Sequence, residues 1–234
     1  MNKLFLLSIF FNVVFLLCLL KIVNGLGGFS YLIFRVQGGA GFTGMYEHRK
    51  NLFEMLPKST GEIIFLGDSI TAECEWSELF DKQNIQNRGI SGDTASGILK
   101  RLSPIFEAKP DKLFLMVGIN DLIYGNERGL LQNYEQILQQ LTDNLPDTQI
   151  IVQSILPVNS DVRKMPIANE TIRAVNKKIK SLSDKFGLVY AHLYPLMADN
   201  QQRLKAEYTS DGIHINGKAY SVWKEAVEGL ISEK

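Results

Sequence analysis

The sequence predicts an α/β fold in which five parallel strands form a sheet that helices cover on both faces. Two observations lead to this prediction. Short β-rich runs alternate with longer stretches whose apolar residues recur every three or four positions, which is typical of strands alternating with amphipathic helices. Glycine-led polar clusters follow several of the runs, as expected where buried strands end in loops. With 234 residues, the chain has room for one large domain besides its N-terminal segment.

The N-terminal segment, residues 1–23, is predicted to be a signal anchor or a signal peptide that forms an apolar helix. Residues 4–20 carry three side chains that are polar or cysteine, and a lysine flanks each end of the run. This length lies between that of a signal-peptide core and that of a membrane-spanning helix. Because no clear small-residue cleavage site follows, we favour an anchor that attaches the protein to the membrane with its main domain outside the cytoplasm. If the segment is cleaved, the protein would be secreted or periplasmic.

Residues 24–57 are predicted to form a connector that ends in a short helix. Seven glycines punctuate 25–44 without the spacing of a phosphate-binding loop. From 45 to 56, apolar residues alternate with charges, which predicts an amphipathic helix that Pro57 ends and that packs on the outside of the main domain. The main domain is expected to occupy 58–234.

The strands and helices of the main domain follow in order. Strands are predicted where short runs rich in apolar residues are bounded by glycine, proline or polar residues, at 63–66, 85–87, 113–117, 149–155 and 188–190. Helices are predicted at 76–80, 98–106, 130–141, 167–186 and 216–231, and apolar residues at three-and-four spacing mark the second of them. Thr94 is the expected N-terminal cap of the second of these helices.

Composition argues against several function classes. The chain carries 25 basic and 25 acidic residues, its pI is about 6.8, and it has no basic run, so we expect no nucleic acid partner. Cys74 is the single cysteine of the main domain and is expected to pack on a helix face. Three histidines, His48, His192 and His214, are too scattered to predict a metal site. We expect His48 at the surface and His192 in structural packing.

Four polar clusters carry the candidate chemistry. Three of them each follow one of the first three strands: Gly-Asp-Ser at 67–69, Gly-Ile-Ser-Gly-Asp-Thr at 89–94 and Gly-Ile-Asn-Asp at 118–121. Because the carboxyl ends of parallel strands meet at one edge of a sheet, these clusters can converge on a single site. The fourth, Asp-Gly-Ile-His at 211–214, precedes the last helix, and its three-residue step lets the carboxylate reach the imidazole.

Ser69 is the candidate nucleophile. By itself, Gly-Asp-Ser is more typical of a turn in which Asp68 or Ser69 caps a helix. Together, however, the clusters supply the groups that acyl transfer needs, with His214 as general base and Asp211 as the group that orients it. The candidate donors to the developing oxyanion are the backbone N–H groups of Ser69 and Gly92 and the side-chain amide of Asn120. Asp93 and Asp121 are expected to hold the loops that carry the last two donors.

In order and type, the four clusters resemble the motif blocks of the SGNH hydrolases, also called GDSL esterases, from about residue 62 to the carboxyl end. The residues that match the four namesake positions and the acid are Ser69, Gly92, Asn120, His214 and Asp211. Gly-Ile-Ser-Gly-Asp-Thr is most similar to the branch of the platelet-activating-factor acetylhydrolase subunits and the bacterial lysophospholipase/thioesterases. The resemblance implies a three-layer, flavodoxin-like α/β/α fold, no metal, no cofactor, and a mechanism through an acyl-Ser69 intermediate.

We therefore expect a serine esterase that acts on short acyl groups, such as O-acetyl groups on carbohydrate or small molecules. The loops after Asn120 and before Asp211 are short and leave little material for a deep acyl channel. A lysophospholipase or thioesterase acting on longer chains is the alternative within the same class. A non-catalytic surface binding protein that reuses the fold is the alternative from another class, which the intact set of site residues disfavours.

Overall fold

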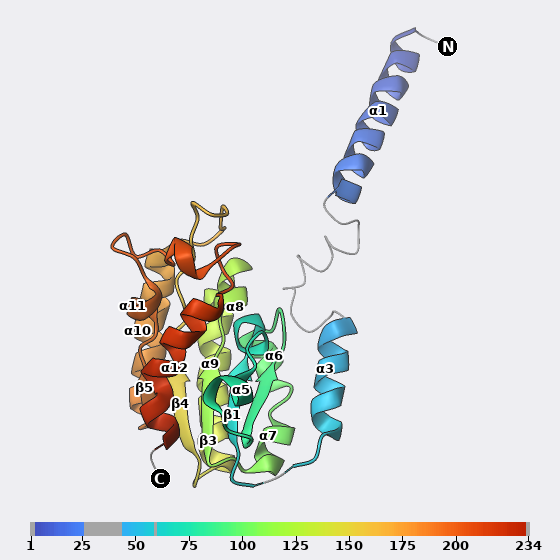
Figure 1. Ribbon diagram of the computed structural model, residues 1–234. Helices are drawn as coiled ribbons and strands as arrows, with labels where there is room; N and C mark the ends of the chain where they lie inside the picture. The colour runs from blue at the N-terminus through green and yellow to red at the C-terminus, as the bar shows by residue number, and fades with distance from the viewer. Residues whose placement is uncertain (1–2, 26–43, 59, 233–234) are drawn as a thin grey trace. The chain divides into compact units, whose positions relative to one another are not determined.

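The computed structural model describes residues 3–25, 44–58 and 60–232, and the chain divides into two compact units, Met1–Gly39 and Ala40–Lys234 (Figure 1). The first unit contains α1 (Lys3–Gly25), a helix at the position where the sequence predicts one. Ser8 and Asn12 interrupt its apolar residues, and the Asn12 side chain donates to the Ser8 carbonyl at 2.7 Å.

The predicted membrane anchor is not supported by the structure. None of the helices in the described ranges is both long enough and apolar enough to cross a membrane. The predicted membrane partner and membrane-anchored location depended on that anchor, so they are unsupported as well. The cleaved-signal alternative stays a prediction.

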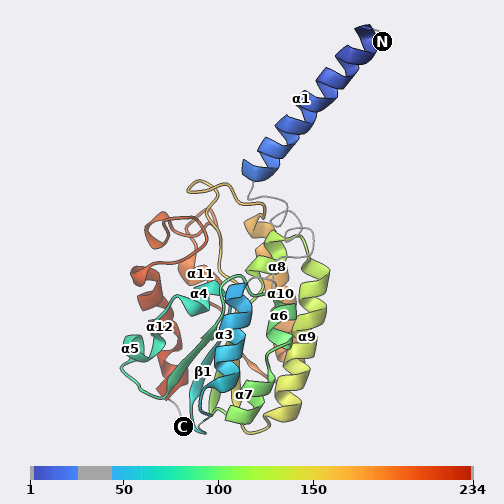
Figure 2. The ribbon, with the colours of Figure 1, turned by 90° about the vertical axis from the view of Figure 1, so that its right-hand side faces the viewer.

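Most of the predicted connector, 26–43, lies outside the described residues, but the amphipathic helix at its end is present as α3 (Gly44–Met55). The Tyr46 hydroxyl donates to the Gly97 carbonyl at 2.8 Å. Phe53 is buried against Ile90, and the Arg88 guanidinium lies 5.1 Å from its ring centroid. These contacts hold α3 against the rest of the second unit, where Figure 2 shows it next to α6 and α7.

Five parallel strands form one sheet in the order β2-β1-β3-β4-β5, which confirms the predicted five-stranded parallel sheet. This is the strand order of flavodoxin-like folds. Every residue of β1 and β3 is buried, because helices cover both faces of these central strands. The strands are β1 (Ile63–Gly67), β2 (Ile85–Gly89), β3 (Lys112–Met116), β4 (Gln149–Gln153) and β5 (Val189–Ala191).

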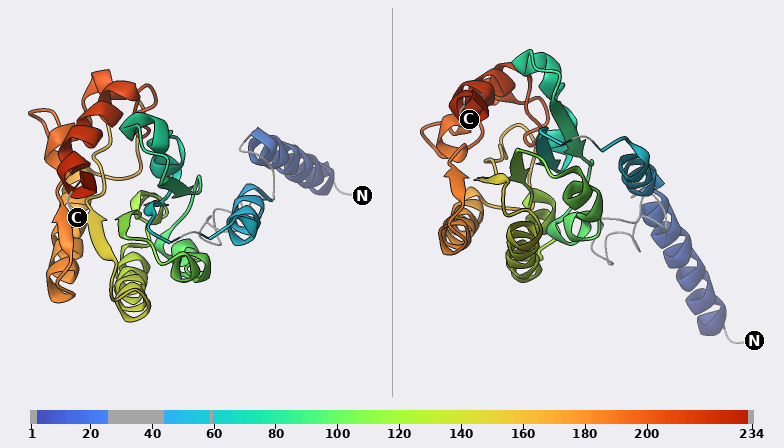
Figure 3. Two further views of the ribbon diagram at one scale, coloured as in Figure 1. Left: turned by 60° about the horizontal axis from the view of Figure 1, so that its bottom comes forward. Right: turned by 90° about the horizontal axis from the view of Figure 1, so that it is seen from below.

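Helices lie on both sides of the sheet, with α5 and α12 on one face and α7, α9 and α10 on the other (Figure 3). The elements in chain order are α4 (Ser69–Ala72), α5 (Trp76–Phe80), α6 (Ala95–Leu99), α7 (Ser103–Ala108), α8 (Ile119–Ile123), α9 (Glu127–Asn144), α10 (Asn169–Lys185), α11 (Tyr194–Met197), the 3-10 helix η1 (Ala206–Tyr208) and α12 (Gly217–Ser232).

Two differences from the predicted elements have physical causes. The helix predicted at 98–106 is divided between α6 and α7, because Pro104 in the first turn of α7 has no N–H to continue the preceding helix. The short elements α4, α8, α11 and η1 were not predicted. Each has five residues or fewer, little more than one helical turn.

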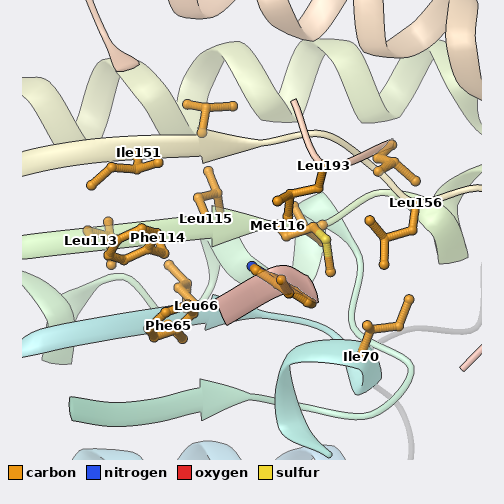
Figure 4. Close-up of a cluster of buried hydrophobic side chains, with 14 of the residues drawn as sticks. Phe65, Leu66, Ile70, Leu113, Phe114, Leu115, Met116, Ile151, Leu156 and Leu193 are labelled. Atoms are coloured by element: carbon orange, nitrogen blue, oxygen red, sulfur yellow. The ribbon is translucent and has the colours of Figure 1, made fainter. Parts of the chain in front are cut away.

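The hydrophobic core lies between the sheet and its helices. Phe65 stacks on Trp76 at 3.9 Å and on Phe114 at 4.6 Å between ring centroids. Figure 4 shows buried side chains of β1, β3 and β4, together with Ile70, which lies just beyond the end of β1 and belongs to the same core cluster. Cys74 is 5% exposed and belongs to the same core, so the predicted packing is present, but the residue lies between α4 and α5 and not on a helix face. Ile70, the neighbour of Ser69, is therefore anchored in the main hydrophobic core.

Candidate active site

Three of the four polar clusters leave the sheet from neighbouring strands at one level. Gly67 at the end of β1 is in register with Gly89 of β2 and with Met116 of β3. The second and third clusters are also joined directly, because the side-chain amide of Asn120 donates to the Asp93 carbonyl at 2.9 Å. The three loops therefore meet at one edge of the sheet.

Ser69 is the first residue of α4, directly after β1. Asp68 caps this helix, and its carboxylate accepts the Ile70 N–H at 3.0 Å. Ile70 is 2% exposed, and its carbonyl accepts the Tyr220 hydroxyl at 2.7 Å. The cap and the core contact fix the turn. Of the two residues that the sequence offers as a helix cap, Asp68 is the cap, and the Ser69 hydroxyl has a different partner.

That partner is His214. Nε2 of His214 lies 2.9 Å from Oγ of Ser69, and Nδ1 of the same ring lies 2.6 Å from Oδ2 of Asp211. With the proton on Nδ1, the imidazole donates to the carboxylate and Nε2 accepts the serine hydroxyl proton. The structure thus joins three of the five predicted site residues in one hydrogen-bonded chain, across 145 residues of sequence.

The turn that contains Asp211 keeps its carboxylate charged. Oδ1 of Asp211 accepts the backbone N–H groups of Ile213 at 3.0 Å and His214 at 2.8 Å. Burial acts to raise the pKa of Asp211, but the His214 side chain and these two N–H groups outweigh it and lower the pKa to about 2. Asp211 is therefore ionised at neutral pH and suited to stabilise a protonated His214.

Glu73 provides a second carboxylate near the imidazole, which sequence reasoning missed. Its Oε1 lies 3.8 Å from Nε2 of His214, too far for a hydrogen bond but close enough to attract an imidazolium. Glu73 follows Ser69 by four residues and ends α4. The i,i+4 spacing, which places two side chains on one side of a helical turn, was the signal that could have identified it.

The two remaining candidate oxyanion donors lie on adjacent loops. The Asn120 amide has two hydrogens, and its bond to the Asp93 carbonyl uses one, which leaves a second N–H for a substrate. Gly92 has φ +78°, and a Cβ at this position would meet nothing within 4 Å. The positive φ therefore explains why glycine suits this position.

A buried ion pair supports these loops. Nε of Arg101 lies 2.7 Å from Oδ2 of Asp93, and the two side chains are 2% and 0% exposed. The same guanidinium donates to the carbonyls of Gly67 at 2.9 Å and Arg88 at 2.8 Å. Burial raises the pKa of Asp93, and Arg101 opposes that rise. Sequence reasoning expected Asp93 to hold its loop but missed Arg101, which ties that loop to the end of β1.

The buried carboxyl groups of this region are expected to make stability depend on pH. Asp121 is 2% exposed and accepts the Ala95 N–H at 3.0 Å. Burial raises its pKa from 3.8 to about 7 despite that bond, and burial likewise raises the pKa of Asp68 to about 7. For both groups, the pKa is higher in the folded chain than in the unfolded chain. Their contribution to stability is therefore fully present below about pH 4 and is lost as the pH rises to about 7.

Asp121→Asn keeps the acceptor for the Ala95 N–H and removes the titration. We expect the free energy of unfolding to fall less steeply between pH 4 and 7 in this variant than in the native chain, by up to about 1.4 kcal/mol per pH unit. Urea unfolding at several pH values measures this difference. Asp143→Asn, at an exposed position, is the matched control and should retain the native slope. Equal slopes for Asp121→Asn and the native chain would refute the assignment.

Comparison with known proteins gives three kinds of match. The model of the GDSL-like lipase/acylhydrolase family matches residues 65–222, a range that contains all five predicted site residues. Platelet-activating factor acetylhydrolase IB subunit alpha1 of Bos taurus is 27% identical over 126 residues, which make up 51% of this chain and 53% of that protein. The chain thus spans about half the length of the curated relatives it matches.

Solved structures share the fold over most of the second unit. A structure from Streptococcus pneumonia described under the name platelet activating factor has a TM-score of 0.71 and 28% identity, covering 80% of this chain and 91% of that one. An acetylxylan esterase of Geobacillus stearothermophilus has a TM-score of 0.59 at 18% identity, covering 76% of this chain and 96% of that one. At that identity, the second likeness concerns the fold alone.

Proposed function

The chain belongs to the GDSL-like lipase/acylhydrolase family, and from this premise we propose that it is a serine esterase that hydrolyses short-acyl carboxylic esters through an acyl-Ser69 intermediate. The observation that carries the proposal is the hydrogen-bonded chain from the Ser69 hydroxyl through His214 to Asp211, with distances of 2.9 and 2.6 Å. A hydroxyl, a base and an orienting carboxylate in this arrangement are the groups that nucleophilic acyl transfer requires.

In the acylation step, Oγ of Ser69 attacks the carbonyl carbon of the ester while Nε2 of His214 takes the hydroxyl proton. Asp211 stabilises the imidazolium through Nδ1, and Glu73 adds attraction from the other side. The carbonyl oxygen becomes an oxyanion, which the N–H groups of Ser69, Gly92 and Asn120 are proposed to stabilise. The imidazolium then protonates the departing alkoxide, which leaves as the alcohol.

In the deacylation step, His214 takes a proton from water, and the resulting hydroxide attacks the acyl-Ser69 carbonyl. The same donors receive the second oxyanion. When it collapses, the bond to Oγ breaks, His214 returns a proton to Ser69, and the carboxylic acid leaves. This cycle needs no group beyond the side chains and backbone N–H groups named here.

The preference for short acyl groups is argued from the surroundings of Glu73, whose Oε1 lies 3.8 Å from Nε2 of His214. A cavity of about 370 Å³ includes Glu73 in its lining, together with Glu75, Glu78 and Tyr220. A fatty acyl chain placed there would have to desolvate carboxylates without giving them partners, which is costly. The curated relatives are named as acetylhydrolases, which agrees with a short acyl group. We propose O-acetyl groups on carbohydrate or small molecules as the substrates.

The test is a series of p-nitrophenyl esters with acetyl, butyryl, octanoyl and palmitoyl groups. We expect kcat/KM to be highest for the acetate and to fall by about tenfold or more at the octanoate, equivalent to a loss of about 1.4 kcal/mol in transition-state binding. A maximum at the octanoate or palmitate would instead support the lysophospholipase or thioesterase alternative. Hydrolysis of none of the four esters would favour a non-catalytic binding protein.

A further inference from the structure

A second cavity, of about 390 Å³, lies between α10 and the segment formed by β5 and α11. None of the five predicted site residues lines it. β5 is the edge strand of the sheet, so the cavity lies at the side of the domain, where Figure 1 shows α10 and α11 next to β5. Its volume is that of a site for a small ligand.

One wall of this cavity is aromatic. The rings of Tyr190 and His192 lie 5.9 Å apart with an interplanar angle of 39°. Tyr194, which is 2% exposed, donates its hydroxyl to the Gln202 carbonyl at 2.8 Å, so its ring is held firmly in the wall. The His192 side chain is exposed, and the structural packing that the sequence predicts for it is limited to this contact with Tyr190. These rings offer flat surfaces against which a planar or ring-shaped group can pack.

The opposite wall is cationic. α10 contributes Arg173, Lys177 and Lys180, which recur at helical spacing on one side of the helix, and no aspartate or glutamate is among the lining residues. Arg173 and Lys180 each contact one carboxylate of α10 outside the lining. Nε of Arg173 is buried and has no hydrogen-bond partner in the described part of the chain. A buried donor of this kind favours a ligand that brings an acceptor.

We propose that this cavity binds a small anionic ligand built on a ring. Its carboxylate or phosphate group would accept from Nε of Arg173 and pair with Lys177, while its ring would pack against Tyr190 and His192. The site is separate from ester hydrolysis and does not depend on it. An aryl acid and a sugar acid share the required chemistry, and the choice of probes distinguishes the two.

The experiment is calorimetric titration of the full chain with phenyl phosphate and with glucuronate, and with phenol and glucose as uncharged counterparts. We expect saturable binding of at least one anionic probe and much weaker binding of its uncharged counterpart. Arg173→Gln/Lys177→Gln should weaken the binding about tenfold or more, because charge-assisted hydrogen bonds are lost. Phenyl phosphate binding identifies an aryl ligand, and glucuronate binding identifies a sugar acid.

The control is Lys178→Gln, since Lys178 is adjacent on α10, pairs with Glu127 and does not line the cavity. It should bind the probe as the native chain does. Lys177→Glu, at an exposed position, serves as a second test that leaves Arg173 in place and should also weaken binding. Thermal unfolding at the native midpoint temperature shows that each variant is folded. Binding of neither anionic probe, or equal binding in the native chain and the folded variants, would overturn the proposal.

Discussion

Ser69→Ala is expected to lower kcat/KM for p-nitrophenyl acetate by about 10⁴-fold or more, because it removes the atom that attacks the ester. The fold should be unaffected, since the cap made by Asp68 and the core packing of Ile70 involve other atoms of the turn. Initial rates of ester hydrolysis measure the loss, and thermal unfolding of the same samples checks the fold.

Ser91→Ala is the matched control for this variant. Ser91 is an exposed serine in the neighbouring loop, next to Gly92, and makes no contact assigned to the mechanism. We expect its kcat/KM to stay near the native value. If Ser69→Ala retained a rate within about tenfold of the native chain, the acyl-Ser69 mechanism would be wrong, because serine nucleophiles of this type contribute far more than that.

Arg101→Ala is expected to destabilise the protein by about 3 to 5 kcal/mol, because the Asp93 carboxylate would be left buried without a countercharge. The carbonyls of Gly67 and Arg88 would also lose their donor. Urea unfolding at pH 8 measures the change in the free energy of unfolding. We expect ester hydrolysis to fall as well, since the Gly92 loop is tied to the end of β1 through this guanidinium.

The double variant Arg101→Met/Asp93→Asn distinguishes a charge effect from a packing effect. Removing both charges eliminates the uncompensated carboxylate, so this variant should be more stable than Arg101→Ala. Lys185→Ala is the surface control, because its ion pair with Glu135 is largely exposed and should contribute little. An Arg101→Ala protein as stable as Lys185→Ala would contradict the role given to the buried pair.

The sheet could be predicted from the sequence because its central strands are apolar along their whole length. Residues 63–66 and 113–117 are buried on both faces, so their composition identifies them. The edge strand β2 is harder to predict from the sequence, because Asn87 and Arg88 are polar. The Asn87 side chain donates to the carbonyls of Thr71, Ala72 and Cys74 at the end of α4. Such tertiary contacts have no local sequence signal, which explains why β2 extends beyond its predicted end.

The site likewise contains residues that have a local sequence signal and residues that only tertiary contacts reveal. Ser69, Asp211 and His214 could be identified because each lies in a short motif whose residue types suit one chemistry. Arg101 could not, since the Gly67 carbonyl it binds is 34 residues away in the sequence. Its ionic partner Asp93 lies eight residues earlier, on the loop that precedes α6, and this pairing depends on the fold as well. Sequence motifs thus indicate the residues proposed to react, and the structure is needed to find the residues that hold them.

The central claim is that Ser69 is the nucleophile, and the most direct test is peptide mass spectrometry of the full chain treated with a fluorophosphonate, whose phosphorus a nucleophilic serine oxygen attacks with loss of fluoride. The account predicts a covalent adduct on Ser69, with none on the corresponding peptide of Ser69→Ala and much slower labelling of His214→Ala, which lacks the base. An active protein that is labelled at another residue, or labelled equally fast in His214→Ala, would contradict the account.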